Sequence, residues 1–119
     1  MKTIQEIFDI MAGHLLAQNE RSGGIEGGEF RCKYLDSDGK KCAVGALIST
    51  ETYDSRIEDR PFSGTLCRDI LIENEIDVHD LAIFNLIDEV REIHDYAEVY
   101  MWRDHLMKIA TAYGLEFKF

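Results

Sequence analysis

The sequence has a single proline, three cysteines and no long apolar run, and each shortage excludes a class of protein. One proline among 119 residues, of which 45% are hydrophobic, argues against a disordered or linker-rich chain. No apolar run approaches the ~20 residues that a membrane-spanning helix needs. Near the N-terminus Glu6 and Asp9 interrupt the apolar pattern, which is not typical of a signal peptide. We therefore expect one globular domain, residues 1–119, that resides in the cytoplasm and does not bind a membrane.

The three cysteines and the known sequence fingerprints are equally restrictive. An odd number of cysteines without an export signal indicates reduced thiols rather than a disulfide framework. The nucleotide-binding, hydrolase and metalloprotease patterns G-x-x-x-x-G-K, G-x-G-x-x-G, G-x-S-x-G and H-E-x-x-H do not occur. We expect no cofactor, and the sequence favours a protein that is not an enzyme without deciding the question.

Basic residues are scarce, and the shortage is concentrated in the middle of the chain. The net charge is −10: residues 51–100 carry fourteen acids and four bases, whereas residues 1–50 carry seven acids and six bases. A protein with this balance repels phosphate backbones, so direct binding of nucleic acid is not expected. Three interpretations remain: attraction to a basic protein surface, mimicry of nucleic acid, or a solvated face that maintains solubility.

Hydrophobic periodicity predicts an α+β fold that is mostly helical, with about four to five helices packed on a small antiparallel β-hairpin. The capping-box spacing of Thr3 and Glu6 marks the start of the first helix. The predicted elements are a helix over 4–19, a hairpin over 30–44 that leads into a short helix over 43–48, and helices over about 65–74, 78–96 and 98–113.

The hairpin prediction depends on the Asp38-Gly39 dipeptide, because tight hairpin turns favour residues that tolerate positive φ. The expected strands are Phe30–Leu35 and Lys40–Val44. A lone two-stranded hairpin is marginal in water, so one of its faces must pack on helices. This arrangement places Cys42 where the second strand meets the short helix.

Cys42 is the first candidate for chemistry. The N-terminus of a helix stabilises a thiolate, and Lys40 and Lys41 add positive charge beside it. A cysteine enzyme also needs a base, which the tertiary fold could supply from His94 or His14. The alternative is that Cys42 is a small buried side chain that fills the corner. Cys42 and His94 therefore remain candidates, and no catalytic residue is assigned.

A zinc site is the second possibility. Cys32, Cys42 and His94 are residue types that bind zinc, but the sequence has no C-x-x-C pair of the kind that tight zinc knuckles use. His94 lies near the apolar margin of its predicted helix. Such a histidine also occurs as a residue at the edge of the core, with its ring bonded to backbone or to a carboxylate. We therefore assign no metal.

Two motifs give the chain a resemblance to a known family. The first is the string Cys32-Lys-Tyr34 followed, after a turn, by K-C-A-V-G-A-L-I from Lys41, and the second is His94-Asp95 with Trp102 downstream. The chain resembles a family of small uncharacterised proteins encoded in bacteriophages, prophages and bacterial genomes. The resemblance implies a phage-type context, and it implies no activity.

The acidic balance leads to the functional hypothesis. On a helical wheel of 78–96 the acids fall opposite the apolar half, which predicts an acidic helical face. We expect this face to occupy a host or bacterial protein, including a basic nucleic-acid-binding protein. The predicted binding residues are Asp80, Asp88, Glu92, Asp95, Tyr34 and Trp102. The alternative is a small-molecule pocket or a cysteine-dependent enzyme built around Cys42 and His94.

Overall fold

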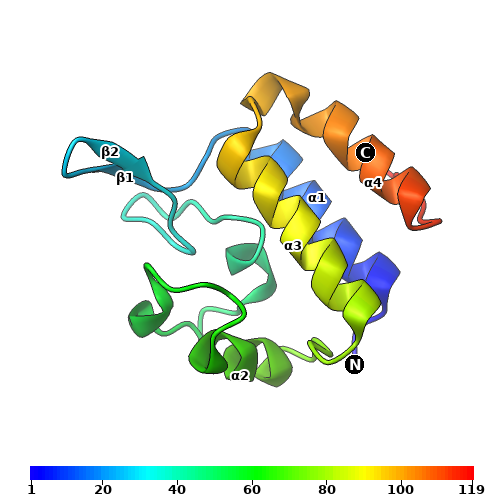
Figure 1. Cartoon of the computed structure of the whole chain (residues 1–119), viewed down its shortest axis with the longest axis horizontal. Coiled ribbons are helices and arrows are strands. Elements are labelled where there is room, and N and C mark those ends of the chain that lie inside the picture. The colour runs from blue at the N-terminus through cyan, green and yellow to red at the C-terminus, as the bar shows by residue number, and fades with distance from the viewer.

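The computed structural model describes all 119 residues as four α-helices, three short 3₁₀ helices and one two-stranded hairpin. Helices α1 (Ile4–Gln18), α3 (Leu81–Tyr96) and α4 (Trp102–Ala112) pack against one another, and α2 (Thr65–Glu73) lies apart from α4 (Figure 1). The predicted α+β, mostly helical class is confirmed. No helix combines the length and the apolar character that crossing a bilayer requires.

Helix α1 begins and ends where its sequence indicates. The side chain of Thr3 accepts the backbone N–H of Glu6, and the Glu6 carboxylate accepts the backbone N–H of Thr3. The helix ends at Asn19, which adopts the left-handed conformation with φ of 52°. Its apolar residues recur at helical spacing and form a buried stripe: Ile7, Phe8, Met11, Ala12 and Leu15.

Helices α3 and α4 complete the core. The carboxylate of Asp80 accepts the backbone N–H groups of Ala82 and Ile83, so α3 begins later than the predicted 78. The predicted helix 98–113 is divided into the 3₁₀ helix η3 (Val99–Met101) and α4. One face of α3 is buried against the neighbouring helices: Ile83, Leu86, Ile87, Val90, Ile93 and His94.

The hairpin lies earlier in the chain than the sequence predicted. Strands β1 (Gly24–Glu26) and β2 (Glu29–Arg31) pair antiparallel, and Gly27 and Gly28 connect them with φ of 59° and 84°. A two-residue turn of this kind needs positive φ at both positions, which two consecutive glycines supply without steric cost. The Gly27-Gly28 dipeptide therefore forms the turn of the hairpin.

The predicted strands over 30–44 do not form a ladder. Only one isolated bridge, between Leu35 and Lys41, spans the Asp36–Gly39 turn. The carboxylate of Asp36 accepts the backbone N–H groups of Asp38 and Lys40 at 2.9 Å, which folds the segment into a tight loop. Local side-chain bonds thus replace the cross-strand bonds that a hairpin needs.

The predicted short helix 43–48 is a single 3₁₀ turn, η1 (Gly45–Leu47). A Cβ on Gly45 would lie 2.0 Å from the carbonyl oxygen of Tyr34, so only glycine allows the two segments to approach this closely. A further 3₁₀ turn, η2 (Ser55–Ile57), precedes α2. Of these two turns, η1 packs against α1.

Candidate functional site

A pocket of about 490 Å³ lies between α3 and two loop segments. One wall is Cys32–Tyr34, which follows β2, and a second wall is Asp59–Ser63, which precedes α2. Cys42 contributes to the lining beside them. The volume falls within the range of small-molecule sites, which is about 300–1,000 Å³.

Helix α3 supplies the third wall from a single face. Phe84, Asp88, Arg91 and Asp95 line the pocket, and they are spaced at i, i+4, i+7 and i+11. Residues at this spacing lie above one another along one side of a helix. The face therefore combines an aromatic ring with three charged groups.

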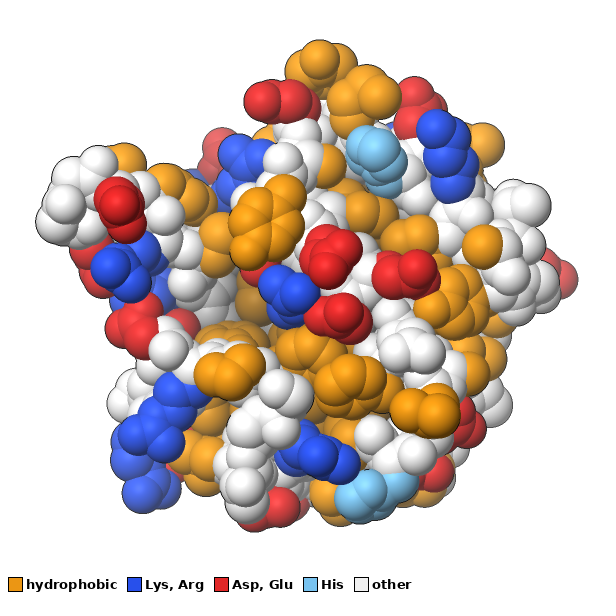
Figure 2. Space-filling model, viewed as in Figure 1, with side chains coloured by type: hydrophobic (Ala, Val, Ile, Leu, Met, Phe, Trp, Pro, Cys, Tyr) orange, Lys and Arg blue, Asp and Glu red, His pale blue; other side chains and the backbone are white.

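Arg91 is held by the carboxylates beside it. Its Nη2 lies 2.8 Å from Oδ1 of Asp88, its Nη1 lies 3.2 Å from Oδ2 of Asp95, and Glu92 is 3.7 Å away. Burial opposes the charge of Arg91, but the hydrogen bond and negative charge of Asp88 and the charge of Asp95 raise its pKa. Figure 2 shows acidic side chains gathered over the middle of α3 beside a basic one. Arg91 thus neutralises part of the negative charge on this face of α3.

Asp95 is the centre of the polar network in the pocket wall. Its Oδ1 lies 2.8 Å from Nδ1 of His94, and the Cys32 sulfur lies within 4.8 Å of the Asp95 carboxylate. Burial alone would raise the pKa of Asp95, but the hydrogen bonds from His94 and Cys32 and the charge of Arg91 hold it below its ordinary value. Asp95 is therefore a half-buried, ionised acceptor rather than a free surface charge.

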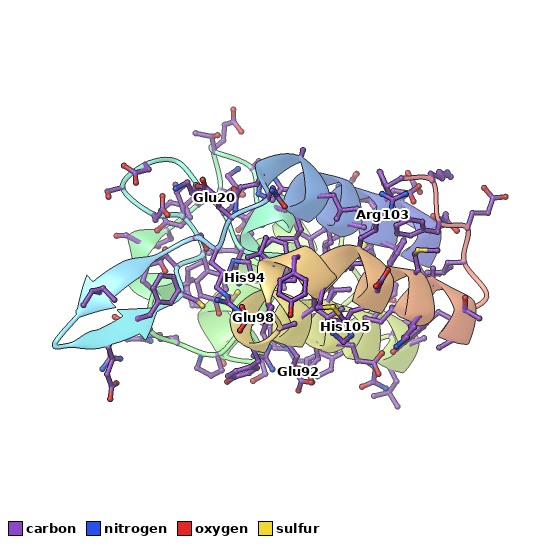
Figure 3. All side chains as sticks on the ribbon, turned by 90° about the horizontal axis from the view of Figure 1, so that it is seen from above. Glu20, Glu92, His94, Glu98, Arg103 and His105 are labelled. Carbon is purple, nitrogen blue, oxygen red and sulfur yellow. The ribbon has the colours of Figure 1, made fainter.

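His94 lies beneath this network, deep between the ribbons, whereas Glu92 lies at the edge of the molecule (Figure 3). The backbone N–H of Ser22 donates to Nε2 of His94 at 3.1 Å, so Nε2 carries the lone pair. The ring hydrogen is then on Nδ1 and is donated to Asp95. The ring also stacks on Trp102, with 5.6 Å between centroids. Both ring nitrogens of His94 therefore have hydrogen-bond partners within the protein, and the ring is fully buried.

The structure favours the packing alternative for Cys42, because the thiols are buried or partly buried and are not activated. Burial raises the pKa of Cys42 to about 12, and burial together with the charge of Asp95 raises the pKa of Cys32 to about 12. Burial also raises the pKa of Cys67, to about 11. Cys42 precedes only a single 3₁₀ turn, which lacks the dipole of a helix, and its sulfur accepts the N–H of Gly45. All three thiols are protonated at neutral pH.

The hydrogen bonds of His94 with Ser22 and Asp95 also determine whether this site can bind a metal ion. Cys32, His94 and Asp95 offer ligand atoms within 4.8 Å of one another, while the predicted candidate Cys42 is not part of this cluster. A metal on Nδ1 of His94 would move the ring hydrogen to Nε2, where it would face the N–H of Ser22. Two donors would then oppose each other in a buried position. The donor set therefore does not fit a metal ion.

Aromatic side chains form the apolar part of the pocket. The rings of Phe62 and Phe84 stack with 4.9 Å between centroids, and Tyr34 lies beside them with its hydroxyl donating to the carbonyl oxygen of Arg60. Tyr34 thus lies in the pocket wall, as a ligand-binding residue would. Trp102 does not: it is fully buried, because the turn before α4 directs its ring into the core against His94.

The four predicted acidic residues have different roles. Asp80 caps α3, Asp88 and Asp95 pair with Arg91, and Glu92 is exposed. Asp88 and Asp95 belong to the pocket wall rather than to an outer acidic face. The acidic residues predicted on one surface are therefore divided between a cap, a pocket and the solvent.

Three residues of the site, Arg91, Ser22 and Arg21, were not predicted from the sequence. Arg91 has a recognisable signal, because Asp88 and Asp95 lie three and four residues away on the same helix. Arg21 donates to the carbonyl oxygens of His94 and Ala97 and so closes the C-terminal end of α3. Its partners lie more than 70 residues away, and no local pattern indicates such a contact.

The chain was compared with models of known protein families, with curated proteins and with solved structures, and it matches none of them.

Proposed function

We propose that this chain is a cytoplasmic, phage-type protein that binds a small organic ligand in the pocket between α3, Cys32–Tyr34 and Asp59–Ser63. One observation carries the proposal. A hollow of about 490 Å³ places the stacked rings of Phe62 and Phe84 beside a charged group, Arg91, whose position two carboxylates fix. An apolar surface with a few oriented polar groups is what small-molecule sites have in common.

The surrounding chemistry favours binding over catalysis. Protonated thiols do not act as nucleophiles, and both ring nitrogens of His94 already have hydrogen-bond partners. Neither half of a cysteine–histidine pair is therefore available. The pocket holds its polar groups in fixed positions, as recognition requires, and provides no activated group.

The lining also restricts the chemistry of the ligand. Three carboxylates (Asp59, Asp88, Asp95) and three bases (Lys33, Arg60, Arg91) line the pocket, so it has no formal net charge. Lys33 is paired with Glu26 at 2.9 Å, and Arg91 is paired within α3. A polyphosphate would find no free cluster of cations. We propose a planar ligand that is neutral or zwitterionic and stacks on the two phenylalanine rings.

The test is a screen of small aromatic and heterocyclic fragments, read by the shift in melting temperature and by NMR. Ser63→Trp places a large ring at the pocket, and the matched control Ser55→Trp places it at another exposed serine outside the pocket. Fragments that stabilise the native protein are expected to stabilise the Ser55 variant equally and the Ser63 variant not at all. Hits that bind both variants alike, or no hits, would contradict the proposal.

A second candidate, binding to a basic host protein, is favoured by a separate observation. Tyr96 and Tyr100 are 78% and 81% exposed, and Glu92 lies one helical turn before Tyr96. Tyrosine is enriched in protein interfaces, and an exposed acid beside it would attract a basic partner. On this proposal the binding surface is Glu92, Tyr96 and Tyr100 rather than Asp88 and Asp95, which lie closer to Arg91 than Glu92 does.

This candidate is tested by immobilising the protein and passing over it a purified basic nucleic-acid-binding protein at low and high salt. Retention at low salt that is lost in Tyr96→Ala and weakened in Glu92→Gln supports it. Glu73→Gln, an exposed acid on α2, is the control and is expected to bind as the native protein does. Retention that Tyr96→Ala leaves unchanged would exclude the surface.

A further inference from the structure

The hairpin projects from the helical body (Figures 1 and 3), and the residue pair at its centre is apolar. Ile25 and Phe30 face each other across the two strands, and they are 71% and 47% exposed. Every residue of β2 is exposed. A two-stranded ribbon without a covering layer is marginal in water, so both its apolar pair and its open edges are positions where another chain can add to the sheet.

We propose that β2 is a self-association edge, at which two copies of this chain pair their β2 strands antiparallel about a two-fold axis at Phe30. The product is a four-stranded sheet that runs from β1 through both β2 strands to the partner's β1. Such a contact is isologous, because each copy presents the same three residues to the other. It goes beyond ligand binding and does not depend on the pocket.

The hydrogen-bond pattern of the hairpin places the free backbone groups correctly. A two-residue turn makes Glu26 and Glu29 the closing, hydrogen-bonded pair, and the alternation of an antiparallel ladder then makes Ile25 and Phe30 a non-bonded pair. The N–H and C=O of Phe30 therefore point away from β1. Two copies that meet at Phe30 can exchange both bonds symmetrically, as a hydrogen-bonded pair requires.

The charges on β2 specify the same register. Glu29 and Arg31 flank Phe30, and neither has an ion-pair partner within 4.0 Å in the single chain. In antiparallel self-pairing about Phe30, Glu29 of each copy lies opposite Arg31 of the other, and the two Phe30 rings meet. Antiparallel self-pairing through β1 would place Glu26 of each copy opposite Gly24 of the other, and no opposite charges would face each other. The open edge is thus charge-complementary to itself.

The experiment is sedimentation velocity on the full chain from about 10 µM to about 1 mM, a range suited to the weak association of a small interface. The native protein is expected to pass from monomer to dimer. Glu29→Arg and Arg31→Glu each place like charges opposite one another twice, and each is expected to weaken dimerisation by roughly tenfold or more. The double variant E29R/R31E restores both pairs and is expected to dimerise again.

Mixing the two single variants supplies a further test, because their heterodimer has opposite charges at both positions. Glu73→Arg and Lys108→Glu make the same changes in net charge at exposed positions on α2 and α4, and they are expected to dimerise as the native protein does. Circular dichroism and melting curves verify that each variant is folded. A protein that is monomeric throughout, single variants that dimerise normally, or a mixture and a double variant that do not recover would each overturn the proposal.

Discussion

The backbone N–H of Ser22 donates to Nε2 of His94 at 3.1 Å, which joins residues 72 positions apart in the sequence. The bond ties the segment between α1 and β1 to the C-terminal end of α3. It also fixes the His94 ring so that its other nitrogen meets Asp95 in the wall of the pocket. A buried histidine thereby connects the core to the candidate ligand site.

We expect His94→Ala to destabilise the protein by about 3 kcal/mol, because it removes a buried ring, leaves the Ser22 N–H without a partner and removes one hydrogen bond from Asp95. The free energy of unfolding from urea titration measures this. His79→Ala is the matched control, since His79 is exposed, and it is expected to change stability by less than about 0.5 kcal/mol. Equal effects of the two substitutions would show that His94 has no structural role.

Alkylation should follow the raised pKa values of the thiols. At about pH 8 we expect iodoacetamide to leave all three cysteines of the folded protein largely unmodified, because the thiolate is the reactive form. In Asp95→Asn the loss of a negative charge lowers the pKa of Cys32, so Cys32 should react faster than Cys42. Peptide mass mapping identifies the modified residue. Asp88→Asn is the control, and rapid labelling of Cys42 in the native protein would contradict the site geometry.

Stability should fall in acid partly through Asp36. Some burial opposes its ionisation, but the backbone N–H groups of Gly23, Lys40 and Asp38 hold its pKa below the ordinary 3.8. A lowered pKa stabilises the fold above the ordinary value, and this contribution disappears as the pH falls through the folded pKa.

The Asp36→Asn variant should therefore have a free energy of unfolding about 1–2 kcal/mol lower than that of the native protein at neutral pH. Between about pH 4 and about pH 2 its free energy of unfolding should decrease less than that of the native protein does. Urea titration at several pH values measures both quantities. Asp69→Asn, at an exposed position on α2, should behave as the native protein does. An Asp36 variant with the native acid dependence would rule out this contribution.

Gly45→Ala should destabilise the protein by about 2–4 kcal/mol, because the new Cβ would lie 2.0 Å from the carbonyl oxygen of Tyr34 and the backbone must move. Gly24→Ala is the control, since a Cβ there meets no atom within 4 Å. Thermal and urea unfolding compare the two variants. The close approach of the two segments would be disproved by a Gly45 variant as stable as the Gly24 variant.

Much of the fold follows from local pattern. The capping box at Thr3 and the apolar spacing within 65–73, 81–96 and 102–112 predict all four helices to within a few residues, because helix caps and helical periodicity are short-range features. The small antiparallel hairpin was predicted correctly, but its location was wrong, because two turn signals, Gly27-Gly28 and Asp38-Gly39, compete. The carboxylate of Asp36 turns the second into a tight loop.

The candidate site was predictable only in part. Tyr34, Asp88 and Asp95 were named from the sequence and do line the pocket, but Asp88 and Asp95 were expected on an outer face. Trp102 was expected to bind and lies in the core. A helical wheel separates apolar from polar residues, and it does not say which loop will cover a polar stripe.

The sequence by itself determined the helices, the charge balance and the presence of an α+β domain, because these depend on composition and on neighbours a few residues apart. Only the tertiary structure decided that Cys32, His94 and Asp95 meet, that the thiols are held protonated, and that Arg91 neutralises part of the acidic surface. Each of these depends on burial and on contacts between segments far apart in the chain. The pKa of a thiol and the tautomer of a histidine are set by such surroundings and not by sequence neighbours.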